Sequence, residues 1–220
     1  MRGWRRANIS ARSCWKWRVA RFFEPYVGTE YEGGLTKGRK LLIIGESHYN
    51  EPGCEECGEQ ATREVVASYL NGTPAKFFDY VESAASGNRL ALARNEFWRK
   101  VAFANFVQRP MATASHRPTD DHWRDGIEPF WQTVTELKPD LVFMFTSAWS
   151  NWLPSLAPGG DPERTGPIGN DPTWIWSYAL GDRDVLIARF NHPSARSNPP
   201  RAVWKAWADY CWQILEQGNG

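Results

Sequence analysis

The chain has 220 residues, of which 42% are hydrophobic and 23% charged, and its formal net charge is +1. These values are ordinary for a globular protein, and the length predicts one domain with a substantial core. No run of about 18 apolar residues occurs, which predicts no membrane-spanning helix. The N-terminus also lacks the apolar core of a signal peptide. We therefore expect a cytoplasmic monomer.

The positive charge is concentrated at the N-terminus. Seven of the 26 basic residues lie within residues 1–21, which contain no acidic residue, so the remainder carries 19 basic against 25 acidic side chains. Three Trp residues are interleaved with these cations. Such an arm can lie along phosphates while its aromatic side chains stack on bases, and Arg5, Arg6 and Lys16 are the contacts we expect. The alternative is a solubilising or targeting-like helix whose tryptophans pack on the body.

Short apolar runs alternate with helical patterns along the chain. Strands are predicted at Lys40–Ile44, Val101–Val107, Leu141–Phe145, Thr173–Tyr178 and Val185–Phe190. Helices are predicted at about 61–70, 74–85, 89–100, 119–138, 148–156 and 200–216, with a Pro/Gly/Asp-rich loop at 157–172. Thr119 or Asp120 is the expected cap of the fourth helix, and Pro129 is expected to interrupt that helix.

This alternation predicts an α/β fold. Four buried strands separated by helices indicate a three-layer α/β/α sandwich with a central, mainly parallel four-stranded sheet and no second domain. Residues 45–49 (GESHY) follow the first of these strands, and residues 191–196 (NHPSAR) follow the last. Open α/β sheets bind ligands at the carboxyl ends of their strands. We therefore expect the polar side chains of the two segments to meet there.

Four segments, in this order, resemble motifs of the uracil-DNA glycosylase superfamily. LLIIGESHY is similar to the strand and turn that read GQDPY or GEAPG in branches of that family. VAFANFVQ resembles its second-strand motif, and KPDLVFMFTSAWSNWL its strand followed by a small-residue turn and helix. NHPSARSNPP resembles its HPS loop, and the Arg is particularly similar to that of the single-strand-selective uracil glycosylases. The resemblance covers roughly residues 40–205 and implies the same fold.

The resemblance also implies three catalytic residues. Glu46 would orient the attacking water or stabilise the oxocarbenium-like sugar. Asn105 would hydrogen-bond the edge of the base, and His192 would stabilise negative charge on the departing base. Cleavage of a glycosidic bond needs charge stabilisation on both sides, which a carboxylate and a hydrogen-bond donor supply.

The same resemblance implies further contacts with the base and with DNA. Tyr49 would form a wall of a base pocket, which Gly45, Ser47 and His48 complete. Ser194 would hold a phosphate, and Arg196 would fill the space left by the flipped nucleotide. Two positions depart from the family, because Ser47 stands where the GQDPY branch has its Asp and His48 stands where both branches have Pro.

The function expected from these residues is that of a DNA glycosylase. It would flip uracil or another modified pyrimidine out of DNA and hydrolyse its N-glycosidic bond, which leaves an abasic site. Its purpose would be the repair of deaminated cytosine or attack on hypermodified bases of phage DNA. Two other classes stay open. One is a non-catalytic DNA-binding module. The other is a GDS-type serine esterase built on residues 45–47, although Arg189 stands where that class has an Asp.

The four cysteines form no obvious disulfide framework or metal motif. Cys54 and Cys57 make a single CxxC pair, whereas Cys14 and Cys211 stand alone. One such pair is weak evidence for zinc or for an iron–sulfur cluster. We therefore expect four free thiols and no cofactor, with a cluster built from these four residues as the alternative.

Overall fold

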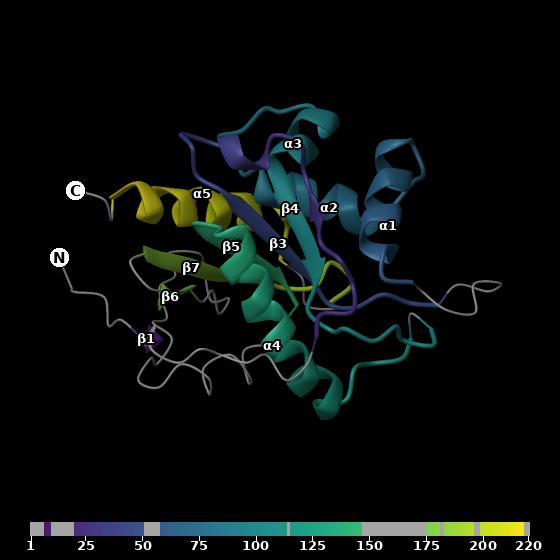
Figure 1. Ribbon diagram of the computed structural model, residues 1–220. Helices are drawn as coiled ribbons and strands as arrows, with labels where there is room; N and C mark the ends of the chain where they lie inside the picture. The colour runs from purple at the N-terminus through teal and green to yellow at the C-terminus, as the bar shows by residue number, and fades with distance from the viewer. Residues whose placement is uncertain are drawn as a thin grey trace.

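The computed structural model describes residues 7–9, 20–50, 58–113, 115–146, 175–180, 183–195 and 199–217. These residues form one sheet with helices on both of its faces (Figure 1). The strands are β1 (Ala7–Ile9), β2 (Tyr26–Val27), β3 (Leu41–Gly45), β4 (Val101–Asn105), β5 (Leu141–Phe145), β6 (Ile175–Leu180) and β7 (Arg183–Phe190). The helices are α1 (Ala61–Leu70), α2 (Lys76–Ala85), α3 (Arg94–Lys100), α4 (Asp120–Leu137) and α5 (Arg201–Gln217), with a 3₁₀ turn η1 at Tyr31–Gly33.

The sheet has seven strands in the order β1-β6-β7-β5-β3-β4-β2. Its four central strands, β7, β5, β3 and β4, pair in parallel, whereas β6 and β2 pair antiparallel to their neighbours. The predicted α/β class is confirmed, but the sheet formed by the described residues is larger than the predicted four-stranded sheet, because further strands extend it on both sides. The first and last predicted core strands, β3 and β7, lie near its middle with β5 between them.

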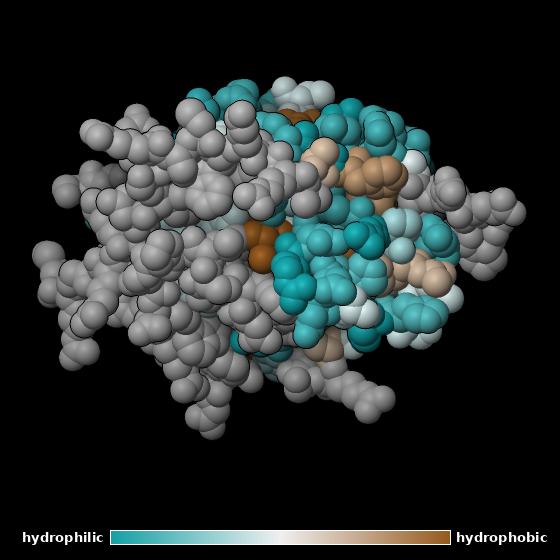
Figure 2. Space-filling view, turned by 60° about the horizontal axis from the view of Figure 1, so that its bottom comes forward, coloured by the Kyte–Doolittle hydropathy of each residue, from teal (hydrophilic) through white to brown (hydrophobic). Residues whose placement is uncertain are grey.

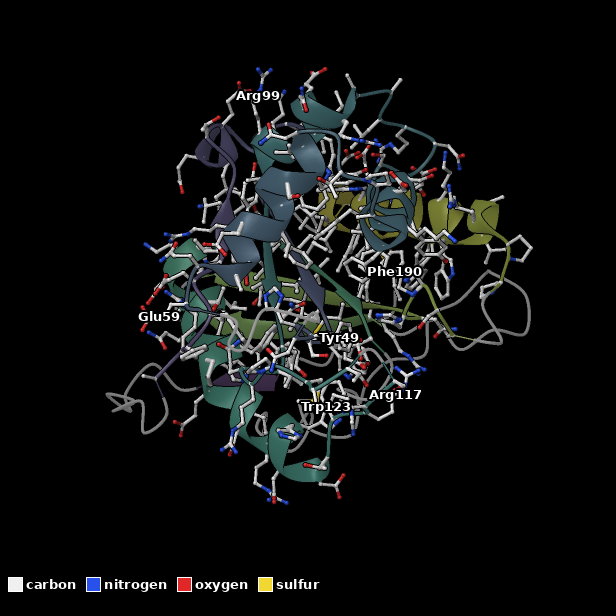
Figure 3. All side chains as sticks on the ribbon, turned by 90° about the vertical axis from the view of Figure 1, so that its right-hand side faces the viewer. Tyr49, Glu59, Arg99, Arg117, Trp123 and Phe190 are labelled. Atoms are coloured by element: carbon white, nitrogen blue, oxygen red, sulfur yellow. The ribbon has the colours of Figure 1, made fainter. Side chains whose placement is uncertain are left out.

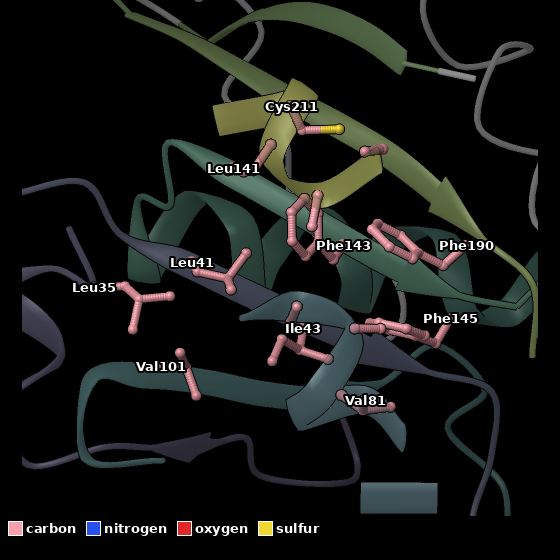
Figure 4. Close-up of a cluster of buried hydrophobic side chains, with 14 of the residues drawn as sticks. Leu35, Leu41, Ile43, Val81, Val101, Leu141, Phe143, Phe145, Phe190 and Cys211 are labelled. Atoms are coloured by element: carbon pink, nitrogen blue, oxygen red, sulfur yellow. The ribbon is translucent and has the colours of Figure 1, made fainter. Parts of the chain in front are cut away.

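Two buried clusters separate the molecule into three layers. On one face, residues of the central strands pack against α1, α2, α3 and α5, and Figure 4 shows part of this cluster around Ile43, Phe143 and Phe190. On the other face, alternate residues of the same strands, including Leu42, Ile44 and Met144, pack against α4. Strands β3, β4 and β5 are buried along their whole length because both of their faces are covered.

Helix α4 runs without a break past Pro129, so the prediction that this residue interrupts the helix is wrong. Its N-terminus has the predicted cap, because Thr119 and His122 form a reciprocal capping box. A proline removes one backbone N–H and therefore one helical hydrogen bond. The free energy gained by packing a long amphipathic helix can exceed the free energy of that lost bond. Here Pro129 is itself buried, and Thr133 donates a hydrogen bond to its carbonyl oxygen at 2.9 Å.

Most other predicted elements agree with the structure to within a few residues, and some fall outside the described residues. The predicted helix 89–100 is shorter, since α3 begins at Arg94. The sequence pattern missed β1 and β2, and β1 lies inside the segment for which a helix was one alternative. The predicted helix 148–156 and the loop 157–172 lie outside the described residues.

The described part of the chain exposes few large hydrophobic side chains. Figure 2 shows one face on which hydrophilic residues predominate among those coloured. Among the described residues, the exposed large hydrophobic side chains are Phe22, Val27 and Val65. Single apolar residues of this kind are normal on a globular protein. No helix in the described part of the chain has the length and apolar character needed to cross a bilayer.

Candidate functional site

The four central strands end at one edge of the sheet, here called the carboxyl edge. Glu46 follows β3, Asn105 ends β4, Thr146 follows β5 and His192 comes two residues after β7. The chain stays paired beyond the ends of β3 and β4, since Phe106 and Val107 donate backbone hydrogen bonds to Gly45 and Glu46. Parallel topology therefore brings the three predicted catalytic residues to one edge.

Glu46 is a buried carboxylate held by two partners. Its side chain is only 8% exposed, and the hydroxyl of Thr146 donates to Oε2 at 2.9 Å. The guanidinium of Arg117 lies 3.6 Å from Oε1. Oε1 accepts no hydrogen bond from the described residues. A buried carboxylate oxygen without a hydrogen bond lowers the stability of the fold, so its presence calls for an explanation such as a functional role. This oxygen is therefore the candidate to hold a water molecule or a substrate group.

His192 is half-buried and lies in the electrostatic field of Glu46 and Arg117. Burial lowers the pKa of His192, the Glu46 carboxylate opposes this effect, and the charge of Arg117 lowers that pKa further. The backbone N–H of Ser194 donates to Nδ1 at 3.2 Å, and the Ser194 hydroxyl lies 2.8 Å from the same nitrogen. Because Nδ1 accepts a hydrogen bond, the neutral ring carries its proton on Nε2. His192 is therefore arranged as a neutral hydrogen-bond donor.

Asn105 lies against the turn that follows β3. It is paired in register with Gly45, and a Cβ atom at Gly45 would collide with the Asn105 side-chain oxygen. Gly45 is thus a close-approach position that lets the buried Asn105 amide sit beside the turn. Gln108 supports this arrangement, because its amide nitrogen donates to the Asn105 backbone oxygen at 2.8 Å.

His48 is bonded to a neighbouring helix. Its Nε2 lies 2.8 Å from the hydroxyl of Thr62 in α1, and its ring packs edge-on against Phe23 with centroids 4.6 Å apart. Burial lowers the pKa of His48 to about 4, which keeps the ring neutral. The geometry makes His48 an anchor between the turn and α1, whereas the family resemblance placed it in the base pocket.

Ser47 and Tyr49 complete the turn. The Ser47 hydroxyl is buried without a hydrogen-bond partner among the described residues. Tyr49 forms a parallel bridge with Met111 and packs at the border of the α4-side core. Figure 3 shows Tyr49 in the same part of the molecule as Arg117 and Trp123.

The sequence analysis missed three residues that surround the site. Arg117 and Thr146 contact Glu46, and the ring of Phe77 in α2 lies 5.5 Å from that of His192. Thr146 could have been found, because it directly follows a predicted strand. The positions of Arg117 and Phe77 depend on tertiary packing and leave no signal in the sequence pattern.

Several predicted residues lie outside the described part of the chain. These are Arg5, Arg6, Lys16, Arg196, Cys14, Cys54 and Cys57. Ser194 is described and exposed beside His192. Cys211 is a fully buried thiol in the core around α5, and burial raises its pKa. Among the described residues, no group of three or more His, Cys, Asp and Glu side chains could hold a metal ion.

No family model matches the chain, and no curated protein matches it either.

Proposed function

We propose that the protein is a DNA glycosylase that flips uracil or another modified pyrimidine out of DNA and hydrolyses its N-glycosidic bond. The observation that carries this proposal is the pairing, at the carboxyl edge, of a buried carboxylate with a neutral imidazole donor. Glu46 supplies negative charge and an oxygen that accepts no hydrogen bond from the described residues, and His192 supplies an N–H. An oxocarbenium-like sugar and an anionic leaving base need these two groups.

The residues divide the reaction between them. Oε1 of Glu46 stabilises the developing sugar cation and holds the attacking water, while Thr146 fixes the other oxygen. As the bond from C1′ to the water oxygen forms and the bond from C1′ to the base nitrogen breaks, Oε1 accepts the proton that the water loses. His192 donates from Nε2 to the base as negative charge develops there. The Asn105 amide, held over Gly45, reads the edge of the flipped base. The resemblance of the four sequence segments supports the same assignment.

The serine esterase alternative has weaker support. Its nucleophile would be Ser47, but the Ser47 hydroxyl has no hydrogen-bond partner among the described residues, and Nε2 of His48 is bonded to Thr62. A serine nucleophile needs an adjacent base. A buried carboxylate oxygen that accepts no hydrogen bond from the described residues also supports catalysis over a purely DNA-binding module, because a catalytic role gives such a group a use.

A base-release assay tests the proposal. Oligonucleotides that carry single uracil or modified pyrimidine residues, and phage DNAs with hypermodified bases, are incubated with the protein, and released bases are identified by mass spectrometry. We expect Glu46→Gln and His192→Ala each to slow release by about two orders of magnitude or more, the usual loss for one electrostatic stabiliser. DNA binding should survive both changes, because phosphate contacts dominate affinity.

Two controls sharpen this assay. Glu64→Gln alters an exposed carboxylate in the first turn of α1 and should leave release unchanged. Hydrolysis of a p-nitrophenyl ester, lost in Ser47→Ala, would instead support the esterase. Full base release by either Glu46→Gln or His192→Ala would show that the assigned chemistry is wrong.

A further inference from the structure

Arg117 is held over the carboxyl edge by contacts on both sides of it in the sequence. Upstream, the Met111 backbone N–H donates to the backbone carbonyl of His48, and the Met111 carbonyl accepts from the backbone N–H of Asn50. These two bonds tie this segment to the turn after β3. Downstream, Pro118 restricts the backbone, and Thr119 starts α4 through its capping box. The backbone is thus anchored at Met111 before Arg117 and at Thr119 after it, and the guanidinium lies beside Glu46.

The guanidinium of Arg117 faces in two directions. Nη1 lies 3.6 Å from Oε1 of the buried Glu46, yet the Arg117 side chain is 65% exposed. Among the described residues it is the one cation within ion-pair distance of Glu46. A guanidinium carries five donors in a planar fork, so a single long contact leaves most of them directed outward. Such a fork can hold two anions at once.

The charge of the residues after position 21 makes Arg117 more important for binding an anion such as DNA. Outside residues 1–21 the chain has more acidic than basic side chains, so DNA must be drawn to particular cations and not to a general positive field. A phosphate bound by Arg117 would lie next to the catalytic carboxylate, because the guanidinium is 3.6 Å from Oε1 of Glu46. A phosphate close to the flipped nucleotide would meet this condition.

We propose that Arg117 is a positioning residue that bridges the Glu46 carboxylate and one backbone phosphate next to the flipped nucleotide. This inference rests on the proposed function and names the part of the substrate that the site holds. When the phosphate binds, the guanidinium is fixed between two anions and holds Oε1 in its working position. Arg117 thereby couples engagement of the DNA strand to the geometry of the carboxylate.

Binding and base release by the full-length protein test this proposal on duplexes that carry one target base. Arg117→Ala should reduce the slope of log K against log salt by about 0.9, the value for one lost phosphate contact. It should also slow release at saturating DNA about tenfold. Arg117→Lys should restore the slope, because an ammonium still binds a phosphate, but not the full rate, because it lacks the fork.

Methylphosphonate linkages locate the phosphate. Each of the three linkages on either side of the target is made neutral in turn, and binding is measured for wild type and Arg117→Ala. At one position, the neutral linkage should weaken DNA binding by the wild type but not by Arg117→Ala. This result is the signature of a direct contact in a double-mutant cycle. If the effects of all linkages are the same in both proteins, the proposal is overturned.

The matched control is Arg99→Ala. The Arg99 side chain is 53% exposed and ion-paired with Glu30 at 3.1 Å, but it precedes β4 at the opposite edge of the sheet, as Figure 3 shows. It should leave slope and rate unchanged. If the wild type releases no base, the proposed function fails. The salt dependence of binding and the methylphosphonate series still test whether Arg117 contacts a phosphate. If wild type releases base but Arg117→Ala binds with an unchanged slope, the inference alone fails.

Discussion

His48 ties the turn after β3 to α1 and does so as a neutral ring. Burial lowers its pKa to about 4 from an ordinary value of 6.5. Between these two values the unfolded chain binds a proton that the folded protein does not. The free energy of unfolding therefore decreases as the pH falls from about 6.5 to about 4, and the loss attributable to His48 is about 3 kcal/mol.

The variant His48→Gln tests this prediction, because an amide can still bond to Thr62 but does not titrate. Urea unfolding of both proteins between pH 4 and pH 7.5 gives the difference in their free energies of unfolding. The two proteins differ at a single titratable group, so the difference isolates His48. We expect the wild type to lose about 3 kcal/mol more than the variant as the pH falls. Parallel curves would contradict a buried neutral imidazole.

The residues of the candidate site differ in how far the sequence could predict them. Glu46 directly follows an apolar strand, Asn105 ends one, and His192 comes two residues after one. Parallel topology fixes the edge at which such residues emerge. Arg117 follows no strand, and its place depends on how a loop is tied to the turn at Met111. The bond between His48 and Thr62 likewise depends on the docking of α1, which no sequence pattern shows.

At the level of elements, α4 approaches the end of β4 at a glycine. A Cβ atom at Gly126 would collide with the backbone oxygen and ring of Phe106, which follows β4. Alanine normally improves a helix by about 1 kcal/mol relative to glycine. Here we expect Gly126→Ala to destabilise the protein by about 1–2 kcal/mol, because the clash forces α4 away from the sheet.

Thermal or urea unfolding measures this effect. The control is Gly58→Ala, since an added Cβ atom there meets no atom of the described residues within 4 Å, and its effect should stay within about 0.5 kcal/mol. If Gly126→Ala were as stable as Gly58→Ala, the close contact between α4 and Phe106 would not limit the packing of the helix. Stabilisation by Gly126→Ala would have the same meaning.

The elements that could be predicted are those with a strong periodic pattern. The central strands and four of the five described helices match their predicted ranges closely. Apolar runs and amphipathic stretches of that length are compatible with few other secondary structures. The edge strands β1 and β2 are only three and two residues long, so they carry no pattern of their own. Pro129 lies inside α4 because burial of the helix outweighs one missing hydrogen bond.

At the level of the whole molecule, the N-terminal segment combines a structural part with a charged part. Residues 7–9 form β1 and pair with β6, and Arg21 forms ion pairs with Glu136 at 2.7 Å and Glu24 at 3.1 Å. Deletion of residues 1–21 would remove these contacts together with the charge. A change in DNA binding after such a deletion would therefore have two causes.

A charge-only variant separates the two. Arg2, Arg5 and Arg6 precede β1, and their replacement by Gln together leaves residues 7–9 and Arg21 in place. If these three cations contact phosphates, the slope of log K against log salt should fall by about 2–3, since each contact contributes about 0.9. The urea midpoint should not change. Filter binding on one duplex at several salt concentrations measures the slope.

The matched control removes three exposed cations from other parts of the surface, Lys37, Arg63 and Arg99, again by Gln. Both variants change the net charge equally, so a general attraction between the protein and DNA would lower both slopes alike. We expect only the N-terminal variant to lose slope, because direct contacts release counterions from the phosphates they neutralise. Equal losses would mean that net charge alone acts, and an unchanged slope in the N-terminal variant would remove the arm from the DNA interface.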